Sequence, residues 1–170
     1  MTRAPAPLTI RPAALATISP LLLATALDRE RRGQPMWEPD SLTPAALARA
    51  YPGAQGYATC EGEQMVAAML LVPTDTVFWP ADPPGEALYL HKLAVHPDWQ
   101  GRGLAHALLE AAVTLTREAG RPFLRLDTAA ERPQLRAVYD TFGFRLVREG
   151  TCGPYESAWY ELRVQAEGAD

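Results

Sequence analysis

The sequence predicts an α+β fold in three layers, with residues 1–170 in a single domain. Three observations lead to this prediction. The apolar stretch 87–95 predicts a buried strand, and a glycine-bearing turn and a leucine-rich helix follow it. Two apolar runs, 57–61 and 64–72, flank Gly62 and predict an antiparallel hairpin. Two further strand patterns follow the last helix and close the chain.

The composition is that of an ordinary globular protein, with 48% hydrophobic and 21% charged residues. No apolar run approaches the ~20 residues that span a bilayer, and the start of the chain lacks the apolar core of a signal peptide. The net charge of −4, without a basic patch, argues against nucleic acid as the main partner. Cys60 and Cys152 lack metal-type spacing, so we expect no metal site and interpret them as reduced thiols of a cytoplasmic protein, with a disulfide as the alternative.

Cap and proline signals mark the helices of the first half. The Ser-Pro pair 19–20 predicts a helix that ends near Arg31, because serine caps a helix and proline suits its first turn. The Thr-Pro pair 43–44 repeats the signal and predicts a short helix to Ala50. The other expectations here are a frayed start at 1–7, a strand at 8–11, and loops at 33–40 and 79–85.

Helical spacing marks the elements of the second half. Leu104, Leu108 and Leu115 predict an amphipathic helix that ends at Gly120. The apolar repeat over 132–142 predicts another helix. The strands expected around these helices are 123–128, 144–149 and 158–164.

The turn after the central strand has the character of an anion site. Gly101 and Gly103 let the backbone approach a ligand without a Cβ in the way. The free N–H groups and the dipole at the helix N-terminus then favour a phosphate. A dinucleotide fingerprint requires a third glycine where His106 stands, and a Walker A loop requires a Gly-Lys-Ser/Thr string that the chain lacks.

Two strings resemble motifs of one family. Residues 93–105 contain Leu-Ala-Val-x-Pro followed by Gln-x-x-Gly-x-Ala, which resembles the coenzyme A pyrophosphate loop of the GNAT N-acetyltransferase superfamily. Residues 138–144, Val-Tyr-Asp-Thr-Phe-Gly-Phe, resemble the family's Leu-Tyr-x-x-x-Gly-Phe. The resemblance extends over nearly the whole chain. It implies the GNAT fold, a mixed and mostly antiparallel sheet that opens beside its fourth strand.

The same resemblance implies an activity. Acetyl-CoA (coenzyme A) would be the cosubstrate, and the acetyl group would pass to a primary amine by direct attack in a ternary complex. One alternative is a non-catalytic acyl-CoA-binding or regulatory module on the same fold. The other is a purely structural α/β domain, which explains the two glycines of the turn but not the whole string at 93–105.

The resemblance assigns the cofactor contacts mainly to backbone groups. The N–H groups around the pyrophosphate belong to Gln100, Gly101, Arg102, Gly103, Leu104 and Ala105. The backbone of Leu93, Ala94 and Val95 pairs with the pantetheine arm. The Leu93 N–H also polarises the thioester carbonyl, and such a donor is typically worth ~3 kcal/mol. Arg132 stands where many members have an asparagine that contacts the arm, so it either reaches a coenzyme A phosphate or is exposed.

Two side chains are candidates for proton transfer. By resemblance, Tyr139 is the general acid that protonates the leaving thiolate; its alternative role is core packing. His91 lies two residues before Leu93, so strand alternation puts both on one face, and a histidine titrates near neutrality as a base requires. The strand resembles that of arylalkylamine N-acetyltransferases, in which a histidine is proposed to relay the amine proton; the alternative is a core histidine. Glu86 is a weaker candidate base.

The sequence says least about the acceptor. In the resembling family the first two helices and their loop line this side, which brings Trp37 and Glu38 to it, and an aromatic ring beside a carboxylate suits a cationic amine. Tyr89 stands where other members keep a glutamate or a second histidine. We expect a small-molecule amine, with a peptide N-terminus or lysine as the second choice, and no membrane or nucleic-acid partner. Neither cysteine has a base nearby in sequence, which argues against a cysteine nucleophile, and we expect a monomer or homodimer.

Overall fold

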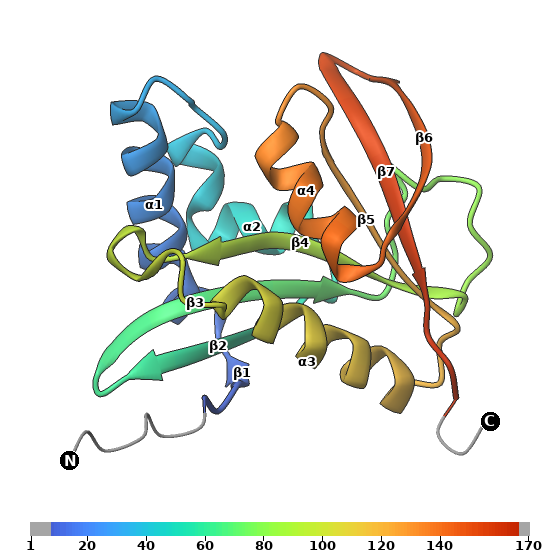
Figure 1. The fold of residues 1–170 in the computed structure, drawn as a ribbon, viewed down its shortest axis with the longest axis horizontal. Coiled ribbons are helices and arrows are strands. Elements are labelled where there is room, and N and C mark those ends of the chain that lie inside the picture. The colour runs from blue at the N-terminus through green and yellow to red at the C-terminus, as the bar shows by residue number, and fades with distance from the viewer. Residues whose placement is uncertain (1–7, 167–170) are drawn as a thin grey trace.

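The computed structural model describes residues 8–166, which form a seven-stranded sheet with helices on both faces (Figure 1). The strands are β1 (Arg11–Ala13), β2 (Gln55–Glu61), β3 (Gln64–Val72), β4 (Ala87–Val95), β5 (Phe123–Ala129), β6 (Arg145–Cys152) and β7 (Tyr155–Arg163). The helices are α1 (Leu15–Arg31), α2 (Pro44–Ala50), α3 (Leu104–Glu118) and α4 (Pro133–Phe142). The expected frayed start at 1–7 lies outside the described residues.

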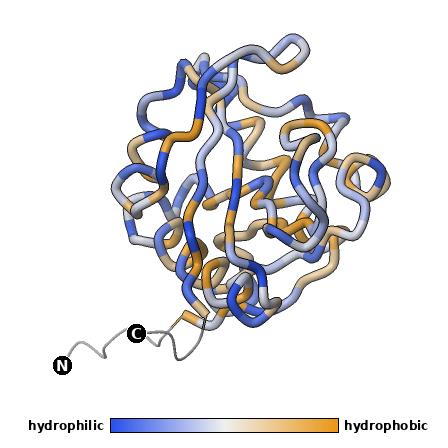
Figure 2. Tube along the Cα trace, turned by 90° about the vertical axis from the view of Figure 1, so that its right-hand side faces the viewer, coloured by the Kyte–Doolittle hydropathy of each residue, from blue (hydrophilic) through white to orange (hydrophobic). Residues whose placement is uncertain are grey.

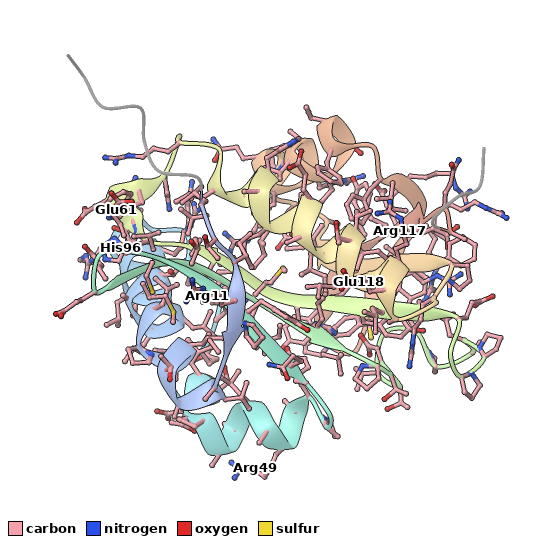
Figure 3. The ribbon with its side chains drawn as sticks, turned by 90° about the horizontal axis from the view of Figure 1, so that it is seen from below. Arg11, Arg49, Glu61, His96, Arg117 and Glu118 are labelled. Atoms are coloured by element: carbon pink, nitrogen blue, oxygen red, sulfur yellow. The ribbon has the colours of Figure 1, made fainter. Side chains whose placement is uncertain are left out.

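The sheet separates two helical layers, as the view in Figure 3 shows: α1 and α2 cover one face, and α3 and α4 cover the other. Leu108 and Leu124 lie in the core beneath α3, and Ile18 and Leu70 lie in the core beneath α1; all four are 0% exposed. Burying one such side chain contributes about 1.5–3 kcal/mol. In Figure 2 the hydrophobic stretches gather along the strands inside the molecule. The predicted three-layer α+β architecture is confirmed.

The sheet opens between β4 and β5, the two strands that run parallel. The strand order is β1-β2-β3-β4-β5-β7-β6, and every other neighbouring pair is antiparallel. β4 pairs with β5 only over Ala87–Tyr89 and 123–125, after which the two strands diverge (Figure 1). β5 continues its pairing with β7 instead, up to Ala129. The described part of β4 beyond Tyr89 therefore has an unpaired edge, as the family resemblance implies.

A bulge in β4 changes which side chains share a face. Lys92 has a φ of +53°, in the left-handed region that residues with a side chain rarely adopt, and the register with β3 shifts at this point. Before the bulge, His91 contacts Tyr51 on the α1–α2 side. After it, Leu93 packs into the core beneath α3. The prediction that His91 and Leu93 share one face is therefore wrong, because simple alternation does not hold across a bulge.

Helix α1 begins earlier than its Ser-Pro pair predicts. It starts at Leu15, because Ile18 is fully buried against the sheet and this packing extends the helix toward its N-terminus. Pro20 consequently lies in the second turn, where its missing N–H removes one backbone hydrogen bond. The hydroxyl of Ser19 caps no helix and instead donates to the carbonyl of Leu42 at 2.5 Å.

Other boundaries follow the predictions more closely. The bounds of β3, β4 and α2 are confirmed, and the Thr43 hydroxyl caps α2 by accepting from the Ala46 N–H at 3.2 Å. β1 begins at Arg11, later than predicted. β6 and β7 are longer, because the mainly polar segments 150–152 and 155–157 pair across an exposed hairpin without an apolar alternation to mark them. Within residues 8–166, no helix is long and apolar enough to cross a membrane.

Candidate active site

The loop before α3 presents a row of unbonded backbone donors. Gly101 and Gly103 have φ angles of +77° and +78°, which glycine adopts without strain. α3 begins at Leu104, so the N–H groups of its first turn lack helical acceptors. Within residues 8–166, no N–H group from Gln100 to Ala105 donates a hydrogen bond. Since the positive end of the helix dipole lies behind them, these groups form a site for an anion such as a phosphate.

Neighbouring side chains support this loop. The guanidinium of Arg102 lies over the Trp99 ring, 4.4 Å from its centroid, so a positive charge stays beside the free N–H groups. His96 accepts from the N–H of Asp98 at 3.1 Å and thereby caps the short 3₁₀ turn that leads into the loop. The predicted anion-binding loop thus lies in one turn, directly after the unpaired edge of β4.

On the α1–α2 side, His91 forms a largely buried pair with Asp75. The His91 Nε2 lies 2.9 Å from Asp75 Oδ2, and the two side chains are 10% and 6% exposed. Asp75 Oδ1 accepts from the N–H groups of Val77 and Phe78 at 3.1 and 2.9 Å. Burial alone would raise the pKa of Asp75, but the hydrogen bonds from His91 and these N–H groups outweigh it and lower the pKa. An ionised carboxylate only accepts, so Nε2 carries a proton and Nδ1 is left as the basic nitrogen.

Asp127 of β5 lies beside this pair and has one carboxylate oxygen without a partner among the described residues. Its Oδ1 is buried and has no hydrogen-bond partner among the residues described. Burial raises the pKa of Asp127 to about 6, against the opposing effect of His91. One ligand atom each from Asp75, His91 and Asp127 lies within 4.8 Å of the other two, close enough to share a single bound cation.

Lys92 completes the cluster from the β4 bulge. Its ammonium lies over the ring of Trp37, 4.8 Å from the centroid, and 5.8 Å from the centroid of Tyr51. Burial lowers the pKa of Lys92 to about 8, and the charge of Asp127 partly opposes this shift. The predicted acceptor residue Trp37 is therefore part of the cluster, whereas Glu38 is exposed and its acceptor contact stays a prediction.

Tyr139 lies on the other side of the sheet, within the core that α3 and α4 cover. Its ring packs against Phe144 and Tyr160, with centroids 5.8 and 5.9 Å away. Burial first, and then the negative charge of Asp127, raise the pKa of its hydroxyl, which therefore stays protonated at neutral pH.

Tyr89, predicted at the acceptor side, is a core residue. It is 3% exposed, and its hydroxyl donates to Asp82 Oδ2 at 2.5 Å. Glu86, the weaker candidate base, accepts from Arg125 at 2.7 Å, and Arg125 also donates to Asp82. These residues form an ion network that anchors the loop before β4. The predicted substrate contact of Tyr89 is wrong, because neither its ring nor its hydroxyl is available.

Arg132 braces the loop after α1. Its guanidinium donates to the carbonyl of Gln34 at 3.3 Å and to that of Pro35. It is therefore engaged on the acceptor side, and its predicted contact with a coenzyme A phosphate has no support in this geometry. The same brace helps hold the segment that carries Trp37 against Lys92.

Sequence analysis missed Tyr51, Asp75, Lys92 and Asp127. The adjacent polar residues at 91 and 92, in an otherwise apolar strand, were an available signal for a bulge. Asp127 follows Arg125 on the same face of β5, so it was also recognisable as a charge on a buried strand. Tyr51 and Asp75 have no such local signal, because folding alone brings them to His91.

Comparison with known proteins assigns the chain to a family. The model of the acetyltransferase (GNAT) family matches residues 23–144. The chain therefore belongs to the acetyltransferase (GNAT) family. Among curated proteins, the Uncharacterized N-acetyltransferase YesJ of Bacillus subtilis (strain 168) is 30% identical over 109 residues, which are 62% of this chain. The match spans 59% of that relative's length.

Solved structures of acetyltransferases share the fold. A GNAT family acetyltransferase from Listeria monocytogenes 4b F2365 aligns with a TM-score of 0.69 and 21% identity, over 92% of this chain and 94% of that one. A GNAT family acetyltransferase from Elizabethkingia anophelis with acetyl-CoA bound aligns with a TM-score of 0.62 and 15% identity, over 92% of this chain and 97% of that one. At these identities the likeness shows the fold, which is the one implied by the two sequence motifs.

Proposed function

We propose that this protein is an acetyl-CoA-dependent N-acetyltransferase that acts on a primary amine by direct attack in a ternary complex. The observation that carries the proposal is the buried Asp75–His91 pair beside the unpaired edge of β4. A module that only binds acyl-CoA needs the N–H loop, but it does not need a buried base held by a carboxylate. The pair therefore favours an enzyme over the binding module.

The backbone supports the cofactor assignment. The N–H groups of 100–105 are free to bind a pyrophosphate, and Arg102 adds charge beside them. The unpaired edge of Leu93–Val95 leads into this loop and suits the extended pantetheine arm. A protein of the same fold from Elizabethkingia anophelis has acetyl-CoA bound. We assign these groups to acetyl-CoA on this basis.

The side chains divide the proton transfers between them. His91 Nδ1 accepts the proton that the amine loses, directly or through a water molecule, and Asp75 stabilises the imidazolium. The Leu93 N–H stabilises negative charge on the thioester oxygen as the C–N bond forms. Tyr139 donates its proton to the sulfur as the C–S bond breaks, so the products are an amide and a thiol.

The cysteines support direct attack rather than a covalent intermediate. Within residues 8–166, no basic side chain hydrogen-bonds to either thiol; Cys60 is exposed, and Cys152 donates to the Val77 carbonyl at 3.6 Å. Both are free thiols.

The test of the proposed function is a panel of primary amines assayed with acetyl-CoA, with released thiol as the readout. At least one amine should release thiol well above the rate of acetyl-CoA hydrolysis, and mass spectrometry should find the N-acetyl product. As a second measurement, calorimetry with acetyl-CoA alone determines whether the protein binds the cofactor. Binding without turnover of any amine would support the binding module and contradict the enzyme.

Replacing Gly103 with valine should weaken acetyl-CoA binding about tenfold or more. A valine at a φ of +78° costs at least about 1–2 kcal/mol, so the loop either stays strained or moves its N–H groups. Gly120→Val is the matched control, because Gly120 has a φ of +70° at the other end of the same helix, and a Cβ meets open space at both sites. Calorimetry should show a larger loss of affinity for the loop variant, and equal losses would contradict the assignment of the loop.

Asp75→Asn should lower kcat by roughly tenfold to a hundredfold, since the imidazole loses the carboxylate that orients it. Asp98→Asn is the control, because Asp98 is exposed and its side chain lies 4.0 Å from His96 rather than at the cluster. An Asp75→Asn enzyme that keeps the wild-type kcat, with the chemical step shown to limit turnover, would contradict a role of Asp75 in orienting His91.

A further inference from the structure

Lys92 is the only lysine among the sixteen Lys and Arg residues of the chain. Its backbone is held at a φ of +53°, and its side chain lies against Trp37 and Tyr51 instead of extending into solvent. Strained non-glycine residues persist only where their surroundings hold them, and they cluster at ligand sites. The position of Lys92 therefore calls for a role beyond surface charge.

The ammonium of Lys92 lacks an acceptor. Within residues 8–166 it forms no ion pair or hydrogen bond, and the groups around it are two aromatic rings. Lys92 directly follows His91, which lies within a 4.8 Å cluster with Asp127, yet Lys92 and Asp127 do not come within the 4.0 Å of an ion pair. Lys92 is only partly buried, and a ligand carboxylate would give its three N–H donors a charged acceptor that the described part of the protein does not supply.

Asp127 carries the opposite charge and, in the described part of the chain, also lacks a partner for one of its oxygens. Its Oδ1 is buried and without a partner among the described residues, and it shares a 4.8 Å cluster with Asp75 and His91. The site thus holds one cation and one anion on the neighbouring strands β4 and β5, near each other but not paired. A single small ligand that satisfies both must have an anionic and a cationic group a few atoms apart.

We infer that the acceptor is an amino acid or a close analogue, whose carboxylate binds Lys92 and whose amine lies at Asp127 and His91. This inference rests on the proposed function and specifies its substrate class. The carboxylate end lies at the Lys92 ammonium, beside Trp37 and Tyr51. The amine end lies at the base, where His91 takes the proton that Asp127 first helps to hold.

The test compares matched acceptors in the wild-type protein and in Lys92→Met. Each amino acid of a panel is assayed beside its decarboxylated amine and its α-carboxamide, with acetyl-CoA saturating and thiol release as the readout. The wild type should prefer the best amino acid over both analogues by at least about tenfold in kcat/KM, as expected for a charge-assisted hydrogen bond. Lys92→Met should bring the ratio close to one, because kcat/KM should fall much further with the amino acid than with its decarboxylated amine.

The structure also provides a readout that does not need turnover. Because Lys92 is the only lysine, reductive methylation with formaldehyde and cyanoborohydride, both in excess over the added amino acid or amine, modifies a single side chain besides the N-terminal amine. Mass spectrometry should show slower methylation of Lys92 in the presence of millimolar levels of the preferred amino acid, but not of its decarboxylated amine. The thermal midpoint of Lys92→Met should change little, because the ammonium forms no ion pair or hydrogen bond with the described residues and methionine keeps the apolar contact with Trp37.

The outcomes separate this inference from the proposed function. Equal or faster turnover of the decarboxylated amines by the wild type overturns the inference and leaves the N-acetyltransferase intact. A preference for amino acids that survives in Lys92→Met, or methylation that no amino acid slows, also overturns it. If no amine in the panel releases thiol, the proposed function fails, and the inference fails with it.

Discussion

His91→Gln is expected to lower kcat by about 10²–10⁴-fold, the range typical of a general acid–base group. The glutamine amide still offers an N–H to the buried Asp75 carboxylate, so that group keeps a partner and the thermal midpoint should move little. What the variant lacks is the basic nitrogen that receives the amine proton. Single-turnover rates with the best acceptor and saturating acetyl-CoA measure this loss without a contribution from product release.

The pH profile of kcat/KM distinguishes the contribution of Asp127 from that of His91. The free enzyme needs a neutral imidazole at His91 and an ionised carboxylate at Asp127. Because the pKa of Asp127 is raised to about 6, this carboxylate is protonated below pH 6 and ionised above it, so kcat/KM falls as the pH drops through about 6. Because Asp127 is unchanged in His91→Gln, this variant should keep the fall in kcat/KM near pH 6 although its rate is lower at every pH.

His106→Gln is the matched control, because His106 is exposed on α3 and bonds only to Glu110 within the described chain. Its rate and pH profile should match those of the wild type. If His91→Gln keeps the wild-type rate with the chemical step shown to limit turnover, His91 is a packing residue beside Tyr51. The base would then have to be another group of the cluster.

Local patterns were enough to predict most of the fold. The apolar runs of β3 and β4 and the cap of Thr43 are local signals, and their elements have the predicted bounds. The Ser-Pro pair at 19–20 was misleading, because tertiary packing of Ile18 extends α1 past the local start signal. The β6–β7 hairpin was predicted too short, because backbone pairing across an exposed turn requires no apolar pattern.

The site was predicted less completely than the fold, for a physical reason. The N–H loop is contiguous in the chain, so its glycines and the helix that follows could be read together. The charged cluster is assembled from β4, β5 and the loop that carries Asp75, and no short window of sequence contains it. The bulge at Lys92 adds a second obstacle, since one inserted residue moves Leu93 to the face opposite His91.

Tyr139→Phe is expected to lower turnover by roughly tenfold to a thousandfold, the low to middle range for general acid–base groups. The substitution keeps the ring and its packing against Phe144 and Tyr160 but removes the hydroxyl, which forms no hydrogen bond among the described residues. Cofactor affinity and the thermal midpoint should therefore barely change. Burial and Asp127 raise the pKa of this hydroxyl, so it stays protonated across the assay range and its loss should not change the shape of the pH profile.

Tyr160→Phe distinguishes proton donation from packing, because Tyr160 is a neighbouring buried tyrosine whose hydroxyl accepts from Arg136 at 3.0 Å. Its loss should lower the thermal midpoint, since Arg136 loses an acceptor, and should leave turnover unchanged. The two variants are thus expected to show opposite patterns, a slow but stable enzyme and a fast but less stable one. If Tyr139→Phe turns over at the wild-type rate with chemistry limiting, Tyr139 is only a core aromatic. If instead it melts much earlier, its hydroxyl is a structural partner, and the acid that protonates the sulfur lies elsewhere.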